Sequence, residues 1–300
     1  MKQRSHRTRQ KGKTMNTNAP NSVCWNITSR CNDKCKFCYR EKYLQELSYD
    51  EQKRVIDNLA GSGVRKLTFA GGEPLLVKNI NELILYAKSQ GLLVGLTTNS
   101  ILLENNQEEC EFLWENLDWL TLSLDGADDV VQTKMSRNAT HATRVKNLLE
   151  RANAYKSRKC KLKVNTVVSS VNKDDIAKLA DVIRRYNIKR WKLFQFTPVR
   201  GEAVETQADF NISLQDFEHV VESMRAVLQG EDIILSSCNQ ENIQSAYFVI
   251  FPNGEVRVTE EGQEHVVGSM LTDEVQMMWS RGGFLKDIHE ERTGFIRNAA

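Results

Sequence analysis

Between residues 22 and 196 the sequence alternates six times between strand-like and helix-like patterns, and this alternation limits the possible folds most strongly. The expected strands share short apolar or alternating runs, and they are 22–28, 64–69, 92–97, 119–124, 161–168 and 191–196. The expected helices between them are 49–60, ended by Gly61, then 79–90, 110–117, 143–155 and 173–186. Such alternation produces a parallel sheet with right-handed crossovers. Six units are too few to close an eight-stranded barrel, so an α/β fold with a partial, open barrel is expected.

The pattern changes after residue 200. A helix is expected at 213–228, a short strand at 233–236, and a β-hairpin within 247–258 around the Asn253-Gly254 turn. We therefore expect three segments: a disordered basic tail at 1–21, the partial barrel at 22–200, and a C-terminal extension at 201–300 that closes the active site.

Composition places the chain among ordinary globular proteins, because 40% of its 300 residues are hydrophobic and 27% are charged. The formal net charge of +2 gives no general signal for nucleic acid or membranes, and no apolar run suits a transmembrane helix. Residues 1–13 carry six cations and no acid, which is typical of a solvated tail. Two other interpretations are that translation begins at Met15, downstream of the first Met, and that the tail contacts nucleic acid. An odd number of cysteines, seven, fits a reducing compartment, so a cytoplasmic protein is expected.

Three of the cysteines, Cys31, Cys35 and Cys38, lie within eight residues. A structural zinc site needs four ligands, and the remaining cysteines are too scattered to supply a neighbouring pair. Iron–sulfur clusters are also held by thiolates at short spacings, normally four of them, so three would leave one iron open to a substrate or cofactor. A coincidental cysteine-rich loop and a zinc knuckle remain as alternatives.

About 30 residues further on, an expected strand ends in Gly71-Gly72-Glu73-Pro74. Two glycines let the backbone approach a ligand closely, although taken alone this segment is an ordinary turn.

The C-x-x-x-C-x-x-C spacing, with an aromatic residue before the last cysteine and Gly-Gly-Glu-Pro downstream, resembles the radical S-adenosylmethionine (SAM) superfamily. The resemblance implies a partial (β/α)6 barrel and a [4Fe–4S] cluster on the three cysteines, with SAM on the open iron. It also implies a set of SAM-binding residues, with Glu73 at the methionyl ammonium and Arg137 at the carboxylate: Phe37, Gly71, Gly72, Glu73, Asn99, Ser123 and Arg137. For the polar residues at strand ends, ordinary turn and cap chemistry is the alternative.

Two expected strands carry cations on one face. By the period of two, Lys163 shares a face with Asn165, and Arg190 shares a face with Lys192. Parallel strands are normally apolar, and a cation that faces into a barrel is costly unless it meets an anion. A triphosphate would suit three inward cations. The alternative is that Arg190 and Lys192 begin their strand at its solvated end.

These segments, with Asn239-Gln240 and Ala246-Tyr247, extend the resemblance to the viperin family of antiviral radical SAM enzymes over most of residues 22–258, in a prokaryotic or otherwise soluble form. The resemblance implies a lyase that uses a one-electron reductant. Its reaction is dehydration of a ribonucleoside triphosphate (CTP, UTP or GTP) to the 3′-deoxy-3′,4′-didehydro analogue, which terminates viral RNA synthesis. A radical SAM enzyme that modifies peptides or tRNA, and a non-catalytic cluster-bearing regulator, stay open as alternatives.

The same resemblance places the nucleotide and its phosphates. Tyr247 is implied as the hydrogen-transfer residue, and the implied substrate contacts are Cys24, Lys163, Asn165, Arg190, Lys192 and Arg281. Cys24 departs from the family, which has asparagine at this position, so the base preference stays open.

Overall fold

A computed structural model describes residues 19–243, 246–260 and 263–293. Met15 and all but the last three residues of the basic tail expected at 1–21 lie outside these residues. None of the helices in these ranges combines the length and apolarity that crossing a membrane requires.

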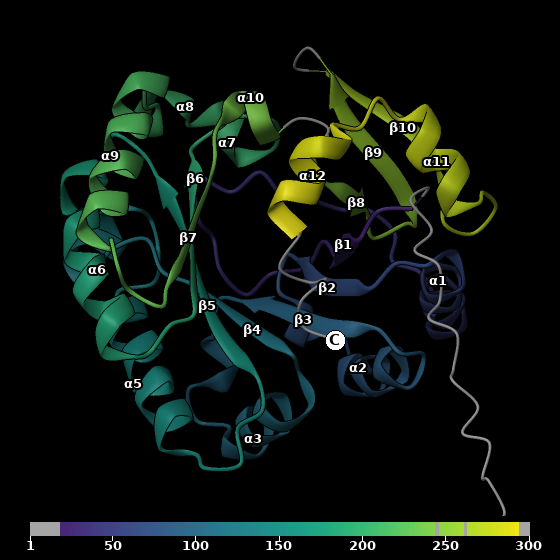
Figure 1. Ribbon diagram of the computed structural model, residues 1–300, viewed down its shortest axis with the longest axis horizontal. Helices are drawn as coiled ribbons and strands as arrows, with labels where there is room; N and C mark the ends of the chain where they lie inside the picture. Colours follow the sequence, from purple (N-terminus) through teal and green to yellow (C-terminus); the bar gives the residue numbers. More distant parts are fainter. Residues whose placement is uncertain (1–18, 244–245, 261–262, 294–300) are drawn as a thin grey trace, which may run out of the picture.

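Ten strands of the described residues form one curved sheet (Figure 1). Its central strands run parallel in chain order: β1 (Ser22–Thr28), β2 (Lys66–Gly71), β3 (Leu93–Thr98), β4 (Trp119–Ser123), β5 (Lys161–Val168) and β6 (Arg190–Gln195). The connecting helices lie outside the sheet: α1 (Tyr49–Ser62), α2 (Ile80–Ser89), α3 (Gln107–Asn116), α5 (His141–Ala154) and α6 (Ile176–Arg185). The partial (β/α)6 barrel predicted from the sequence is confirmed.

The sheet extends beyond the six central strands at both sides. Strand β7 (Ile234–Cys238) is parallel to β6, and β8 (Phe248–Ile250) is parallel to β1. Antiparallel β9 (Glu255–Glu260) completes the predicted hairpin with β8, and β10 (Gln263–Ser269) adds a strand that the sequence did not predict. Since β7 and β10 are the two edges, the barrel is open. No break in the sheet marks residue 200, and the domain division there remains a proposal.

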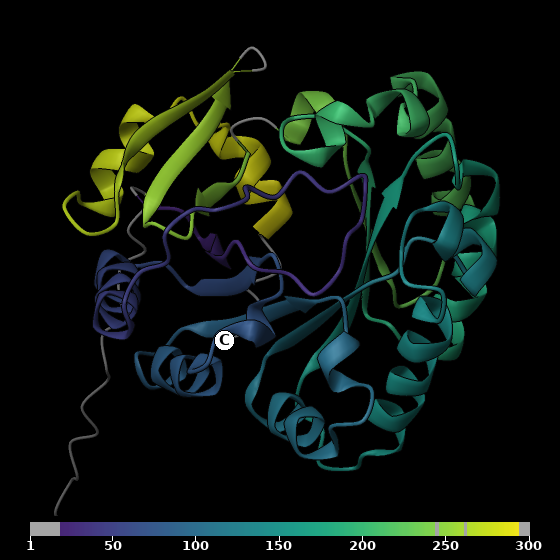
Figure 2. The ribbon, with the colours of Figure 1, turned by 180° about the vertical axis from the view of Figure 1, so that it is seen from behind.

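Helix α12 (Lys286–Thr293) lies across the opening of the barrel (Figures 1 and 2). The Ser22 backbone N–H donates to His289 Nε2 at 3.4 Å, and the other ring nitrogen of His289 lies 3.1 Å from the Ala246 carbonyl oxygen. An Arg190 guanidinium nitrogen donates to the Arg292 carbonyl oxygen at 3.2 Å. The helix therefore contacts the starts of β1 and β6 and the segment before β8.

The remaining helical segments are α4 (Asp129–Lys134), α7 (Glu202–Glu205), α8 (Gln207–Phe210), α9 (Leu214–Val227), α10 (Gln240–Ile243), α11 (Val275–Arg281), and the 3-10 turns η1 (Pro74–Leu76), η2 (Ile101–Leu103) and η3 (Lys173–Asp175). Among them, α9 packs against β6 and β7, and α11 packs against α1 and β10.

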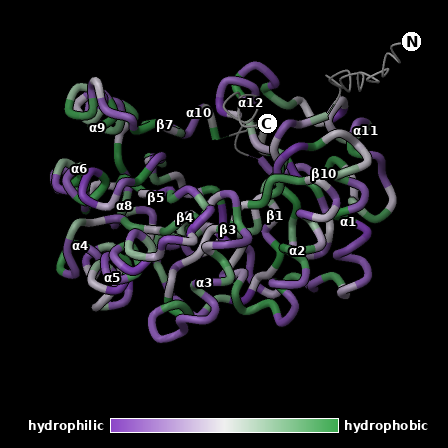
Figure 3. Tube along the Cα trace, turned by 60° about the horizontal axis from the view of Figure 1, so that its bottom comes forward, coloured by the Kyte–Doolittle hydropathy of each residue, from purple (hydrophilic) through white to green (hydrophobic). Residues whose placement is uncertain are grey.

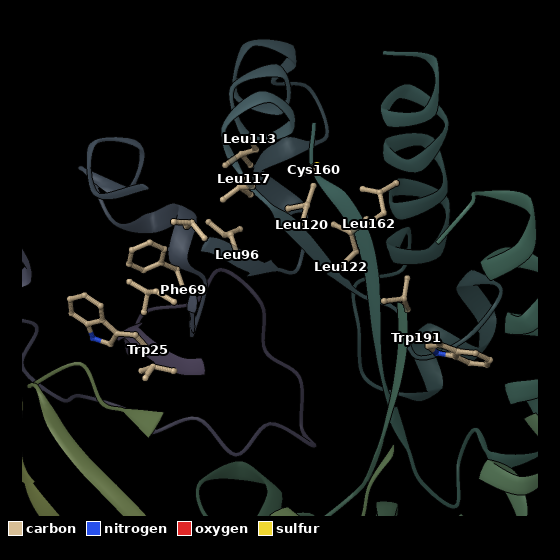
Figure 4. Close-up of a cluster of buried hydrophobic side chains, with 14 of the residues drawn as sticks. Trp25, Phe69, Leu96, Leu113, Leu117, Leu120, Leu122, Cys160, Leu162 and Trp191 are labelled. Atoms are coloured by element: carbon tan, nitrogen blue, oxygen red, sulfur yellow. The ribbon is translucent and has the colours of Figure 1, made fainter. Parts of the chain in front are cut away.

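The two faces of each central strand serve different purposes. On β1, Val23, Trp25 and Ile27 are at most 1% exposed and belong to the core between the sheet and the outer helices, part of which Figure 4 shows. Cys24 and Asn26 alternate with them and line the barrel interior. Hydrophobic and hydrophilic stretches also alternate along outer helices such as α5 and α6 (Figure 3). The hydrophobic core lies between the sheet and the outer helices. The inner face of the sheet can therefore carry polar side chains.

The ends of α1 follow its capping residues. Ser48 and Glu51 form a reciprocal capping box at the start. The helix passes through Gly61, where the sequence predicted its end, and stops at Gly63, whose φ of 93° is left-handed. The prediction was wrong by two residues because only Gly63 adopts the conformation that ends a helix.

Candidate active site

The inner face of the barrel encloses one large cavity of about 1320 Å³. Its wall is made of inward side chains from the strands, the loop after β1, and the end of α12. All three clustered cysteines reach it, as do Cys24, Lys163, Asn165, Arg190, Lys192 and Tyr247. Residues that the sequence placed in one site therefore share one cavity.

The cysteine loop follows the carboxyl end of β1, with inward and outward residues alternating. Cys31, Asp33 and Cys35 are partly buried, whereas Lys34 and Lys36 are exposed. Burial raises the pKa of the Cys31 and Cys35 thiols. Within 19–243, 246–260 and 263–293, no three His, Cys, Asp or Glu side chains are arranged as a metal site. The three thiols are nonetheless the donor type that iron–sulfur clusters use.

The glycine pair packs against the cysteine loop. The backbone N–H groups of Gly72 and Glu73 donate to the carbonyl oxygens of Thr28 and Arg30, both at 2.8 Å. A Cβ on Gly72 would lie 1.9 Å from the Arg30 carbonyl oxygen, and Gly71 has a φ of +129°. The glycines are therefore needed because the loop backbone lies directly on them.

Substitution of Gly72 by alanine is expected to disturb this contact. Forcing a methyl group into packed backbone typically costs about 1–3 kcal/mol, so the free energy of unfolding and the iron content after reconstitution should both fall. Gly61→Ala is the control, because no atom lies within 4 Å of a Cβ there and alanine should stabilise the helix by about 0.5–1 kcal/mol. Urea unfolding and iron analysis measure both variants. Equal stability of the two variants would contradict the packing role.

Glu73 follows the glycine pair and is held by backbone hydrogen bonds. Its side chain is fully buried and is absent from the cavity wall. The carboxylate accepts the Asn99 backbone N–H at 2.8 Å and the Leu75 backbone N–H at 3.2 Å. Burial raises the pKa of Glu73 to about 7. In this structure the carboxylate holds the loop that carries Asn99, and its contact with the methionyl ammonium stays a prediction.

Asn99 lies at the end of β3, beside the cysteine loop. Its Nδ2 donates to Asn32 Oδ1 at 2.8 Å and lies 3.7 Å from Cys31 Sγ. Ser123 reaches the cavity from the end of β4, where its carbonyl oxygen contacts His141 Nε2 at 2.7 Å. Both residues line the cavity, and their contact with SAM stays a prediction.

Arg137 binds the cysteine loop from the segment after α4. Its Nε donates to Asp125 at 2.8 Å, and its Nη1 lies 3.2 Å from Cys35 Sγ and 3.7 Å from Asp33. The guanidinium also stacks over Phe37, 4.9 Å from the ring centre. These contacts hold the cation at the cavity wall, beside the cysteines.

Phe37 anchors the loop in a small apolar cluster. It is 5% exposed and packs with Met135, Phe196, Ala203 and Phe210. Through Phe37 and Phe196 this cluster forms an apolar part of the cavity wall.

A group of cations lines the opposite half of the barrel. Lys66 and Arg190 are the first residues of β2 and β6, Lys163 is paired in register with Arg190, and Asn165 with Lys192. Arg190 and Lys192 are only 7% and 5% exposed, so the alternative of a solvated strand end is wrong. The cations therefore point inward from the amino-terminal half of the barrel, whereas the cysteines lie at its carboxyl end.

Burial and mutual repulsion lower the pKa values of the lysines in this group. Burial lowers the pKa of Lys66 and of Lys192 to about 7, and Arg190 adds repulsion to both. Burial also lowers the pKa of Lys163 well below its usual range, with further repulsion from Lys192 and Arg190. A bound polyanion would raise these pKa values again, because it stabilises the charged lysines.

The acids of the cavity wall do not supply that anion. Each of the five described acidic side chains in the wall forms an ion pair with an arginine or lysine outside this group: Asp33 and Asp125 with Arg137, Glu46 with Arg30, Glu202 with Lys42, and Glu264 with Arg200. None of these ion pairs includes Lys163 or Lys192.

Tyr247 stands at the centre of this half. Lys192 Nζ contacts the Tyr247 hydroxyl and lies 4.4 Å from its ring centre, and the Arg292 guanidinium lies over the ring at 4.9 Å. Burial raises the pKa of Tyr247 well above its usual range. Asn165 Oδ1 is buried without a hydrogen-bond partner in the described structure, so it offers an acceptor to a ligand.

Arg281 does not join this group. It lies on α11, its side chain is 55% exposed, and it is 3.7 Å from Asp273 instead of in the cavity wall. Arg292 on α12 and Lys66 on β2 reach the cavity in addition to the predicted cations. The alternation of Lys66, Thr68 and Ala70 gave the same signal that identified Lys163, but no sequence pattern pointed to Arg292.

A curved parallel sheet, with three thiols at the carboxyl end of β1 and a polar interior, defines a barrel protein with a thiolate site at its mouth. The model of the Radical SAM superfamily matches residues 25–183, and the chain belongs to this superfamily.

Two relatives named S-adenosylmethionine-dependent nucleotide dehydratase match over most of the chain. The protein from Lacinutrix mariniflava is 31% identical over 78% of this chain, which spans only 49% of that relative's length. The protein from Flammeovirga pacifica is 28% identical over 92% of this chain and 95% of its own length. Streptococcus suis SuiB bound to S-adenosylmethionine is a structural neighbour with a TM-score of 0.71 and 17% identity, covering 91% of this chain and 68% of that chain. This last similarity concerns the fold alone.

Members of the superfamily use a [4Fe–4S] cluster and SAM, and the residues of this site fit both. Three thiols project from one loop into the cavity, which continues past Gly71, Asn99 and Ser123. Three protein ligands leave one iron for SAM.

Proposed function

We propose that this protein is a radical SAM nucleotide dehydratase that removes water from a ribonucleoside triphosphate, CTP, UTP or GTP, and gives its 3′-deoxy-3′,4′-didehydro analogue. The observation that carries the proposal is the buried cation group opposite the cysteine loop, in which Lys163 and Lys192 form no ion pair with the five acids of the wall. The names of the relatives support the same reaction class. An antiviral role, through chain termination, and a reducing cytoplasmic location belong to the proposal.

Residues at the two ends of the barrel have different roles. When bound, the cluster and SAM supply a carbon-centred radical that takes a hydrogen atom from the substrate. Cys31, Cys35 and Cys38 hold the cluster, while Phe37, Gly71, Gly72, Asn99, Ser123 and Arg137 form the SAM side of the cavity. At the other end Lys163, Arg190 and Lys192 bind the phosphates through charge-assisted hydrogen bonds, with Lys66 beside them.

Binding the phosphates at the amino-terminal half leaves the ribose between them and the SAM side. Asn165 then offers Oδ1 to a hydroxyl or amino group of the nucleotide, and Cys24 borders the base or sugar. Tyr247, held by Lys192, is the hydrogen-transfer residue beside the ribose. SAM would be held at one end of the cavity and the triphosphate at the other. This arrangement provides the orientation that hydrogen transfer from the ribose requires.

The test is anaerobic incubation of reconstituted protein with SAM, a chemical reductant and each of the four ribonucleoside triphosphates. We expect one triphosphate to stimulate formation of 5′-deoxyadenosine and to yield a nucleotide lighter by one water. The matching free nucleoside is the control and should stimulate far less, since it lacks the phosphates. Equal stimulation by nucleoside and triphosphate, or none by any triphosphate, would favour a peptide- or tRNA-modifying enzyme.

A further inference from the structure

An ion pair joins the two sides of the barrel opening. Strands β7 and β10 are the edges of the sheet and do not pair with each other. Arg200, which lies between β6 and α7, nevertheless contacts the carboxylate of Glu264 on β10. Arg257 on β9 lies 3.9 Å from the same carboxylate. Among the described residues, no backbone hydrogen bond connects 196–210 with 248–269, so side chains make this connection.

The side that carries Arg200 is fixed to the cysteine loop. The Arg200 Nε donates to the Tyr39 carbonyl oxygen at 2.8 Å, and the guanidinium lies 5.4 Å from the centre of the Tyr39 ring. At the start of α7, the Ala203 backbone N–H donates to the Cys38 carbonyl oxygen at 3.2 Å. Hydrogen bonds to the main chain of the cysteine loop therefore hold this side in place.

The side that carries Glu264 is held less completely. Strand β10 pairs with β9 alone, because it is an edge of the sheet. At one end of β10 the Ser269 backbone N–H donates to the Asp273 carboxylate at 3.0 Å, and α11 packs against the strand. Glu264 lies near the other end. That end of the β9–β10 hairpin is the part that can move away when the ion pair breaks, since few other contacts hold it.

The ion pair lies at the border between the cavity and the solvent. Arg200 and Glu264 both line the cavity, and their side chains are 15% and 20% exposed. Phe251, which is 2% exposed, lies beneath both guanidinium groups, with its ring centre 5.0 Å from Arg200 and 4.4 Å from Arg257. A partly exposed ion pair contributes little free energy, so it can open and close reversibly.

We infer that the Arg200–Glu264 ion pair is a gate of the cavity. When the pair is formed, the β9–β10 hairpin closes the opening and shields the cavity from solvent. When it breaks, the end of the hairpin moves away, and SAM or substrate enters or leaves. Closure excludes water and prevents side reactions of reactive intermediates. The gate goes beyond the proposed function and does not depend on the identity of the nucleotide.

The test measures how fast a small reagent reaches a thiol inside the cavity. Cys24 lines the cavity and is not one of the three clustered cysteines, whereas Cys110 and Cys160 lie in the core. Cluster-loaded protein without SAM or nucleotide is treated anaerobically with N-ethylmaleimide. Mass spectrometry of the peptides gives the alkylation rate of each cysteine. Cys24 therefore reports opening of the cavity, and the two core thiols report unfolding of the whole barrel.

Two variants that differ only in the position of the lost charge are compared with the parent. Glu264→Gln removes the charge of the gate and keeps the shape of the side chain. Glu222→Gln is the control, because it removes an exposed ion pair with Arg225 on α9, 2.6 Å long and outside the cavity wall.

We expect Glu264→Gln to alkylate Cys24 about 5-fold faster than the parent, a change that corresponds to about 1 kcal/mol at about 1.4 kcal/mol per tenfold. Alkylation of Cys110 and Cys160 should be unchanged, and the control should match the parent at all three thiols. Added salt weakens ion pairs, so it should accelerate alkylation of Cys24 in the parent and much less in Glu264→Gln.

Three outcomes would overturn the inference. The first is an unchanged rate at Cys24 in Glu264→Gln. The second is equal acceleration at Cys24 and at the two core thiols, which would indicate general destabilisation. The third is an equal response of the parent and Glu264→Gln to salt. Because the assay contains no nucleotide, a wrong substrate assignment would leave the result untouched, and failure of the gate would leave the proposed function standing.

Discussion

Replacement of Cys31, Cys35 and Cys38 together by alanine is expected to lower the iron content of reconstituted protein from about four per chain to near zero. SAM cleavage should fall to background with it. The three thiols reach one cavity from one loop, and Phe37 keeps that loop packed after the substitutions. Iron analysis, the visible absorbance and 5′-deoxyadenosine formation measure the loss.

The matched control removes two cysteines that lie outside the cavity. Cys110 and Cys160 are at most 2% exposed and belong to the core under the outer helices. Cys110→Ala/Cys160→Ala should keep its full iron content, at a cost of about 1 kcal/mol of stability for each substitution. Retention of a full cluster by the triple variant, or its loss from the control, would sink the assignment of the ligands.

Strand period predicted the site better than any single motif. Lys163 with Asn165 and Arg190 with Lys192 lie inward as the period of two requires, because parallel strands of a barrel have one face inside and one under the helices. The bounds of β1 and β5 also agree with the sequence, since turn residues or charged residues limit both strands.

The predictions that were wrong or absent depended on tertiary contacts. α12 has no apolar stripe in Lys286–Thr293, and it is fixed instead by His289, which bonds to β1 and to the segment before β8. Arg292 could therefore not be placed from the sequence. The hydrogen bond from the Asn99 backbone N–H to Glu73 also joins loops after two different strands, which the sequence did not indicate. The Arg-Gly-Gly match at Arg281 did not indicate whether this side chain faces the cavity. In the structure it lies on α11 and is largely exposed.

Removal of two buried cations is expected to weaken substrate binding while making the empty protein more stable. Lys163→Met/Lys192→Met keeps most of the side-chain volume. Each lost contact to phosphate typically costs on the order of 1.5–3 kcal/mol, or roughly 10- to 150-fold in affinity. Neighbouring losses are not additive, so about 100-fold is a conservative expectation for the pair. Triphosphate affinity is measured by calorimetry, and exposed Lys159→Met is the control.

The gain in stability has a defined pH dependence. The pKa of Lys192 is about 7 in the folded protein, below the value of about 10.4 in an unfolded chain. The unfolded chain therefore binds more protons between these values, so the stability of the parent rises with pH from about 7 to about 10.4. Below pH 7 the parent bears the full cost of the buried charge. The advantage of the double variant should be largest there and should shrink as the pH rises.

Triphosphate binding should show the opposite linkage. The anion favours the charged lysines and raises their pKa values, so the protein takes up protons when it binds at a pH above about 7. Affinity should therefore fall as the pH rises from 7.5 to 9, and titrations in buffers of different ionisation enthalpy should show proton uptake in the parent and much less in the double variant. A destabilised double variant would indicate that the lysines serve the fold, and a parent that takes up no protons would place the phosphates elsewhere. Both results are independent of turnover, so they test the phosphate site even where the identity of the base is unknown.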